Sequence, residues 1–142
     1  MKKELKVCNW LLLIVVAIVT ASAIILECLH GSSFLGFSFS SWILMHTVVS
    51  TAMLCLVIWH VKLNWSGVRN WYSRFIYSKS KVMKLTCLFF LLTITTGLIA
   101  IPHWISSGHS GIGGFHGKLG LVALLFMLAH VIKHIRWYAQ KG

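Results

Sequence analysis

Four apolar runs, each about twenty residues long, constrain this chain more than any other feature of its sequence. An α-helix of that length crosses the hydrocarbon core of a membrane and satisfies its backbone hydrogen bonds internally. The composition agrees, because 58% of the 142 residues are hydrophobic, only 11% are charged and the mean hydropathy is +0.83. We therefore predict an all-α integral membrane four-helix bundle, formed by one domain over residues 1–142. The spans are expected at about residues 10–29, 42–63, 83–101 and 116–137.

The formal net charge of +11 would suit a nucleic-acid-binding protein, but the position of the basic residues argues against one. All of them except Lys118 belong to the N-terminal segment, to the segment between the second and third spans, or to the C-terminal segment. Basic segments of this kind stay in the cytoplasm. We expect both termini to be cytoplasmic, in a bacterial cytoplasmic membrane, with lipid rather than nucleic acid around the chain.

Two pairs of histidines repeat at the same spacing inside the second and fourth spans. His46 and His60 are fourteen residues apart, and so are His116 and His130. On a helix, fourteen residues fall only about 40° short of four turns, so both imidazoles of a pair share one face, about 21 Å apart along the axis. The offset between the pairs is seventy residues at both positions. Ionisable residues inside a membrane span are costly and usually functional.

The four spans form two hairpins that both begin on the inner side, which predicts parallel internal repeats about an axis along the membrane normal. This axis would bring His46 level with His116 near the outer face, and His60 level with His130 near the inner face. Neutral imidazole is a common axial ligand of haem iron, so two matched pairs predict two stacked haems. Zinc or copper also binds imidazole, but its ligands would gather at one depth. Histidines that only form hydrogen bonds between helices are the remaining alternative.

The histidine pairs resemble those of the di-haem cytochrome b class. The small size, the four spans, the segment HVKLNW from His60 to Trp65 and the loop before His116 resemble the small cytochrome b-like membrane family linked to flavinylated electron-transfer proteins. The fourth span departs from this pattern, because His134 and the pair Arg136-Trp137 stand where the Asn-Trp step would be.

The resemblance implies two haem b groups and transmembrane electron transfer. Electrons would pass between a quinol or cytoplasmic donor and an extracytoplasmic redox partner, such as a flavinylated protein. One alternative is a stand-alone quinone-linked oxidoreductase of the small cytochrome b561 type, acting on quinone or superoxide. The other is a non-redox membrane component whose histidines bind ions or serve packing.

Several polar residues lie near the expected outer face. Glu27, His30 and His103 are candidates for a proton-handling quinone site, although a carboxylate such as Glu27 also reaches the interface for solvation alone. Lys118 is a candidate partner for a haem propionate, and otherwise extends its ammonium group to the interface. These residues make the outer face the expected place of electron exchange.

Local composition predicts where the spans end. We expect the third span to stop at Pro102, the only proline, since proline disrupts a helix interior. Residues 30–41 and 102–115 carry no charged residue and are rich in glycine, serine and aromatic residues. We expect both to be loops that offer a flat apolar docking surface outside the membrane.

Overall fold

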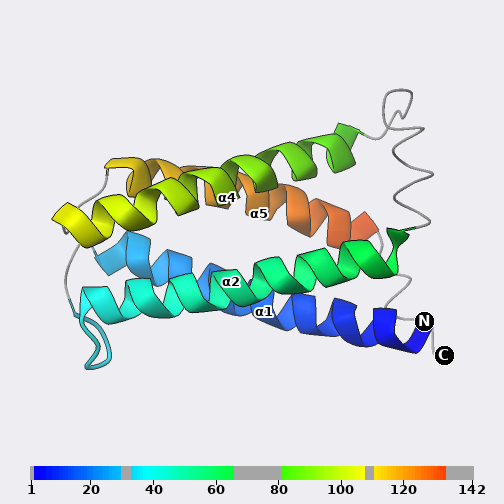
Figure 1. Ribbon diagram of the computed structural model, residues 1–142, viewed down its shortest axis with the longest axis horizontal. Coiled ribbons are helices and arrows are strands. Elements are labelled where there is room, and N and C mark those ends of the chain that lie inside the picture. Colours follow the sequence, from blue (N-terminus) through cyan, green and yellow to red (C-terminus); the bar gives the residue numbers. More distant parts are fainter. Residues whose placement is uncertain (1, 30–32, 66–80, 108–110, 134–142) are drawn as a thin grey trace. The chain divides into compact units, whose positions relative to one another are not determined.

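The protein is all-helical over the residues that the computed structural model describes, which are residues 2–29, 33–65, 81–107 and 111–133. These residues contain four long helices (Figure 1). In chain order they are α1 (Lys2–Leu29), α2 (Phe39–Leu63), α4 (Lys81–Ser107) and α5 (Gly111–Lys133).

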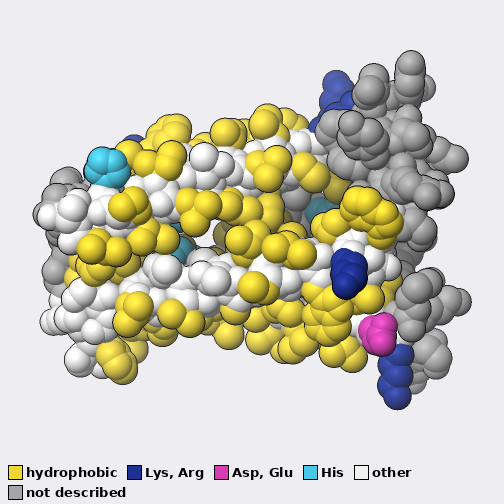
Figure 2. Space-filling view, viewed as in Figure 1, with side chains coloured by type: hydrophobic (Ala, Val, Ile, Leu, Met, Phe, Trp, Pro, Cys, Tyr) yellow, Lys and Arg dark blue, Asp and Glu magenta, His cyan; other side chains and the backbone are white. Residues whose placement is uncertain are grey.

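All four helices are long and apolar enough to cross a membrane, as predicted. Their large apolar side chains lie on the surface rather than in a core (Figure 2). Ile14 of α1, Leu44 of α2 and Leu125 of α5, for example, are 54%, 64% and 67% exposed. Helices that are apolar and exposed on this scale are unfavourable in water and favourable in lipid. The fold therefore indicates an integral membrane protein.

The chain divides into two compact units, residues 1–74 (unit 1) and residues 75–142 (unit 2). In unit 1, α1 packs against α2, and in unit 2, α4 packs against α5. Each pair is an antiparallel helical hairpin (Figure 1).

Small residues form the helix contact of unit 1. Cys8 is fully buried, and its thiol donates a hydrogen bond to the carbonyl oxygen of Leu56 at 3.7 Å. Ser22 is only 1% exposed. Small and weakly polar side chains let two helix backbones approach closely, which is how helices associate in a membrane.

Unit 2 uses the same kind of contact with different residues. Ala123 of α5 is buried, and a Cβ added at Gly120 would meet the Thr93 methyl group of α4 at 3.8 Å. The Thr86 hydroxyl lies within hydrogen-bonding distance, 3.2 Å, of the carbonyl oxygen of Phe126, whose ring stacks on a ring of α4. These contacts fix how α4 and α5 lie against each other.

The predicted ends of the outer loops are wrong. Helix α4 continues through Pro102 to Ser107, and α5 already begins at Gly111, so most of residues 102–115 is helical. Proline removes one backbone hydrogen bond, but ending a helix in an apolar environment would expose several. On the other hairpin, α2 begins at Phe39 rather than near residue 42, and residues 34–37 form a tight turn.

The inner ends also differ from the prediction. Helix α1 begins at Lys2 rather than near residue 10, because the basic start contains good helix formers and lysine side chains extend out of an apolar environment. The expected end of the fourth span near Trp137 lies outside the described residues.

Candidate functional site

The four histidines lie where their spacing predicts, two on each of two continuous helices. His46 and His60 belong to α2, and His116 and His130 belong to α5. All four side chains are half-buried. Because each helix is unbroken between its two histidines, the rings of a pair lie about 21 Å apart along the axis and on one face.

A serine on the neighbouring helix holds the ring of His46. Its Nδ1 lies 2.8 Å from the Ser22 hydroxyl oxygen, and that hydroxyl donates its one hydrogen to the carbonyl oxygen of Val19 at 2.8 Å. The Ser22 oxygen can therefore accept a hydrogen bond from the His46 Nδ1–H, as in the tautomer whose Nε2 carries the lone pair. The hydroxyl of Ser50 lies 3.5 Å from Nε2.

Two asparagines fix the ring of His60. Its Nδ1 lies 2.7 Å from Oδ1 of Asn9, and an amide oxygen can only accept, so the Nδ1–H donates. The amide nitrogen of Asn64 lies 3.3 Å from Nε2 and can only donate, so Nε2 carries the lone pair. Asn9 is itself 8% exposed, which places the contact inside the α1–α2 hairpin.

A backbone carbonyl and a glycine hold the ring of His116. Its Nδ1 donates to the carbonyl oxygen of Thr93 at 2.9 Å, and the Thr96 hydroxyl lies 3.3 Å from the same nitrogen. The ring packs against Gly97, where an added Cβ would lie 2.9 Å from the ring carbon Cε1. Only glycine leaves room for the imidazole at this point of α4.

His60 and His116 therefore share one tautomer, and the contact of His46 with Ser22 is compatible with it. In His60 and His116 the Nδ1–H donates to an oxygen atom of the neighbouring helix, and Nε2 keeps its lone pair. Imidazoles that bind a metal through Nε2 show this arrangement, because the hydrogen bond at Nδ1 fixes the ring and raises its basicity. His130, the fourth, lies in the last turns of α5.

Among the described residues, no three histidine, cysteine or acidic side chains gather around one point as a metal site would require. Zinc and copper sites usually take three or four such ligands. A haem iron takes most of its ligands from the porphyrin and needs only two from the protein.

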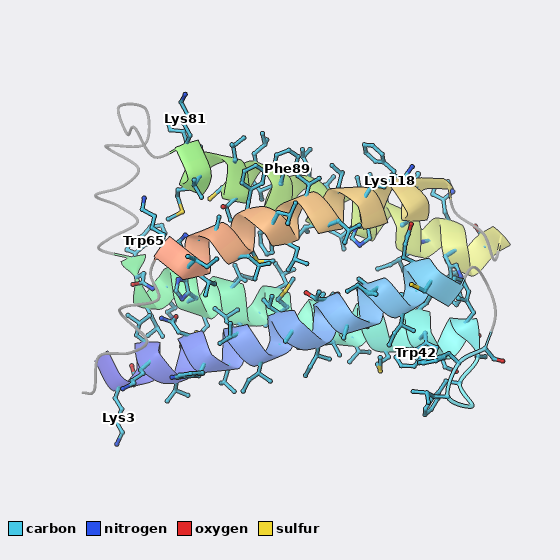
Figure 3. The ribbon with its side chains drawn as sticks, turned by 180° about the vertical axis from the view of Figure 1, so that it is seen from behind. Lys3, Trp42, Trp65, Lys81, Phe89 and Lys118 are labelled. Atoms are coloured by element: carbon cyan, nitrogen blue, oxygen red, sulfur yellow. The ribbon has the colours of Figure 1, made fainter. Side chains whose placement is uncertain are left out.

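The remaining candidates stand apart from the histidine rings. Glu27 is exposed on the last turn of α1, and His103 is exposed on α4 beside a shallow depression lined by apolar side chains and Ser106. His30 lies outside the described residues. Lys118 is exposed on α5 two residues after His116, and its side chain extends away from the helix (Figure 3). Glu27 belongs to unit 1 and His103 to unit 2, so each is a candidate within its own hairpin.

Two of the supporting groups escaped prediction. Asn9 falls in the basic start that was placed outside the first span, although an amide beside a long apolar run is a usable signal. The carbonyl of Thr93 has no signal at all, because every residue has a carbonyl group.

Comparison of the chain with models of known protein families, with curated proteins and with solved structures finds no match in any of the three.

Proposed function

We propose that the protein is a di-haem b-type transmembrane electron carrier. In this proposal His46 and His116 bind the iron nearer the outer face, and His60 and His130 bind the iron nearer the inner face. The observation that carries it is that Nδ1 of His46, His60 and His116 each lies within hydrogen-bonding distance of an oxygen atom of the neighbouring helix. In His60 and His116 this contact leaves the lone pair on Nε2. Nothing in ordinary helix packing requires three imidazoles to make the same contact through Nδ1.

The donor set fits the group. Two neutral imidazoles complete the coordination of a haem iron and leave no open position, which suits electron transfer rather than ligand chemistry. When bound, haem supplies a one-electron couple between ferric and ferrous iron. The oxygen atoms of Asn9 and Ser22 and the carbonyl of Thr93 hold the rings in orientation, so the ligands are in place before the cofactor arrives.

The charge distribution supports an orientation with both termini in the cytoplasm. In each hairpin the open end carries lysines, among them Lys3 and Lys62 in unit 1, and Lys81 and Lys133 in unit 2. Hairpins that both place their open ends inside are parallel repeats. A reporter enzyme fused after the last residue should be active only in the cytoplasm, and activity outside would reverse the orientation.

The outer side is the proposed place of exchange with an extracytoplasmic redox partner. Lys118 follows His116 by two residues at the same end of α5, and its long side chain is proposed to reach a carboxylate of the cofactor there. Glu27, His30 and His103 remain the residues proposed to handle protons or a quinone there. Donors to the inner side would be a quinol or a cytoplasmic reductant.

A stand-alone quinone-linked oxidoreductase is the second candidate. The depression beside His103, lined by Leu98, Ile99 and Pro102, favours it, since quinone sites combine an apolar wall with a titratable group. Quinol oxidation by the purified protein alone, lost in His103→Ala with both haems retained, would support this candidate over the carrier.

Electron flow across vesicles tests the carrier directly. The protein is reconstituted into lipid vesicles that contain ferricyanide, with potassium at equal concentration on both sides, and dithionite is added outside. Valinomycin lets potassium ions enter with the electrons and so balances the charge. Trapped ferricyanide should be reduced much faster than in vesicles without protein, and faster than with His46→Ala. Vesicles whose protein retains both haems but whose ferricyanide is reduced no faster than in protein-free vesicles would contradict the proposal.

A further inference from the structure

The connection between α1 and α2 contains a two-residue turn with unusual backbone geometry. The amide and carbonyl groups of Phe34 and Phe37 exchange two hydrogen bonds, of 3.1 and 3.0 Å. The residues between them, Leu35 and Gly36, both have positive φ angles, 52° and 78°. This is the geometry of the type I′ turn, for which asparagine followed by glycine is the usual pair. Leucine is poorly suited to a left-handed conformation, so its presence needs another explanation.

Trp42 fixes this turn on the first part of α2. Its indole N–H donates to the carbonyl oxygen of Phe34 at 3.2 Å. Its ring lies 6.2 Å from the ring of Phe34 and 6.0 Å, edge to face, from that of Phe37. Trp42 is only 8% exposed, so the aromatic cluster holds the turn in place.

The side chains at the end of the turn are apolar and exposed. Leu35 is 72% exposed, Phe37 58% and Phe34 44%. No charged residue occurs between residues 33 and 41. The apolar surface continues onto α2, because a hollow beside Phe37 is lined by Trp42 and Met45.

The direction of the turn matters for what it can contact. It projects sideways from the end of α2, across the helix axis, in both ribbon views (Figures 1 and 3). Since α2 is a membrane-spanning helix, a sideways projection at its end lies along the membrane surface.

We propose that the Phe34–Phe37 turn is a lipid anchor that places Leu35 and its two flanking phenylalanines in the interfacial layer of the bilayer. Lipid is favoured over a protein partner because the exposed surface is continuous with the lipid-facing surface of α2 and carries no charge. Tryptophan at the end of a span is itself typical of this layer. The anchor also explains the leucine, since an asparagine would suit the turn but would not enter lipid.

Spin labels distinguish a turn that lies in lipid from one that lies in water or against another protein. Leu35→Cys carries the label in a chain whose own four cysteines are replaced by alanine or serine, in vesicles of phosphatidylcholine and phosphatidylglycerol. The matched control is Ser40→Cys, an exposed polar position five residues along. At position 35 the label should relax more strongly with oxygen, which dissolves in lipid, than with a water-soluble nickel chelate. At position 40 the order should be reversed.

Two results would overturn the anchor. Equal access of the nickel chelate to positions 35 and 40 would place the turn in water, and shielding of position 35 from both reagents would place it against protein. A second variant isolates the leucine. With the label at Phe37→Cys, the further change Leu35→Asn keeps the turn but should raise access of the nickel chelate. Unchanged access would show that the leucine does not hold the turn in lipid.

Discussion

The two hairpins hold their histidines with different kinds of oxygen atom. In unit 1 the oxygen atoms at Nδ1 belong to side chains of α1, Ser22 for His46 and Asn9 for His60. In unit 2 the acceptor for His116 is the backbone carbonyl of Thr93. In both hairpins the ring nitrogen Nδ1 thus lies beside an oxygen atom of the neighbouring helix. In unit 1 that oxygen belongs to a side chain, and in unit 2 it belongs to the backbone. The seventy-residue register of the histidines therefore does not extend to the residues that support them.

The helix contacts show the same division. The carbonyl groups of Leu56 and Phe126 are seventy residues apart, as the histidines are, and each lies within hydrogen-bonding distance of a side chain on the other helix of its hairpin. Those side chains, Cys8 and Thr86, are seventy-eight residues apart. These contacts thus share the seventy-residue offset of the histidines on α2 and α5 but not on α1 and α4.

Removal of a histidine ligand should have the largest effect on haem content. It tests whether the histidines of the two hairpins act as pairs. His46→Ala and His116→Ala should each abolish the same haem, and His60→Ala and His130→Ala should each abolish the other. Each variant should retain about one haem per chain. Redox titration of the remaining haem identifies which one is lost. The pairing is wrong if His46→Ala and His130→Ala leave haems with the same potential.

Gly97→Ala should have nearly as large an effect in unit 2. The new Cβ would lie 2.9 Å from Cε1 of His116, so the imidazole must move and the haem it binds should be lost or high-spin. Overpacking of this kind costs about 1–3 kcal/mol. Gly120→Ala is the control on α5, because its Cβ meets only a methyl group at an ordinary 3.8 Å. Equal haem content and spin state in both variants would show that the close contact at Gly97 does not matter.

Asn9→Leu should weaken the inner site of unit 1 without removing its ligand. The Nδ1–H of His60 loses its acceptor, which should reduce haem affinity about 10–100-fold and raise the reduction potential of that haem. Asn64→Ala removes the amide that lies beside Nε2 of the same ring. This variant should keep its haem affinity, because the Asn64 amide and the haem iron would compete for that nitrogen. Haem titration of the apoprotein and potentiometry measure both. An equal loss in the two variants would mean that the asparagines act only through packing.

The smallest expected effect compares the side-chain oxygen beside His46 with the backbone oxygen beside His116. Ser22→Ala removes an interhelical hydrogen bond worth about 0.6 kcal/mol in a membrane and should shift the potential of the outer haem slightly. Thr93→Val alters the side chain but keeps the carbonyl that holds His116, so it should leave the potential unchanged. A larger shift from Thr93→Val than from Ser22→Ala would reverse the comparison between the hairpins.

The number of helices and the histidine geometry could be predicted from sequence, and the helix ends could not. Long apolar runs leave few options other than spans, and a spacing of fourteen residues fixes the face on any unbroken helix. Pro102 and the glycines near Gly111 are strong breakers in water. In an apolar environment they are tolerated, because unsatisfied backbone groups cost more than one lost hydrogen bond.

The supports of the rings were predictable only in part. Asn9 and Ser22 are polar residues in or beside an apolar run, a signal that something on the next helix needs them. Which atom they would meet depends on how α1 packs against α2, and this is set by many weak contacts. The turn at Leu35 could not be predicted from the sequence either, because it contains the usual glycine of such turns but lacks the usual asparagine.

The central claim is tested most directly by the cofactor content of the purified protein. Extracted haem divided by protein should give about two haem b groups per chain, and the reduced spectrum should be that of a low-spin iron with two imidazole ligands. Magnetic resonance of the oxidised protein should show low-spin ferric iron at both sites. A preparation from haem-sufficient cells with one haem or none per chain, or with a high-spin iron, would contradict the account.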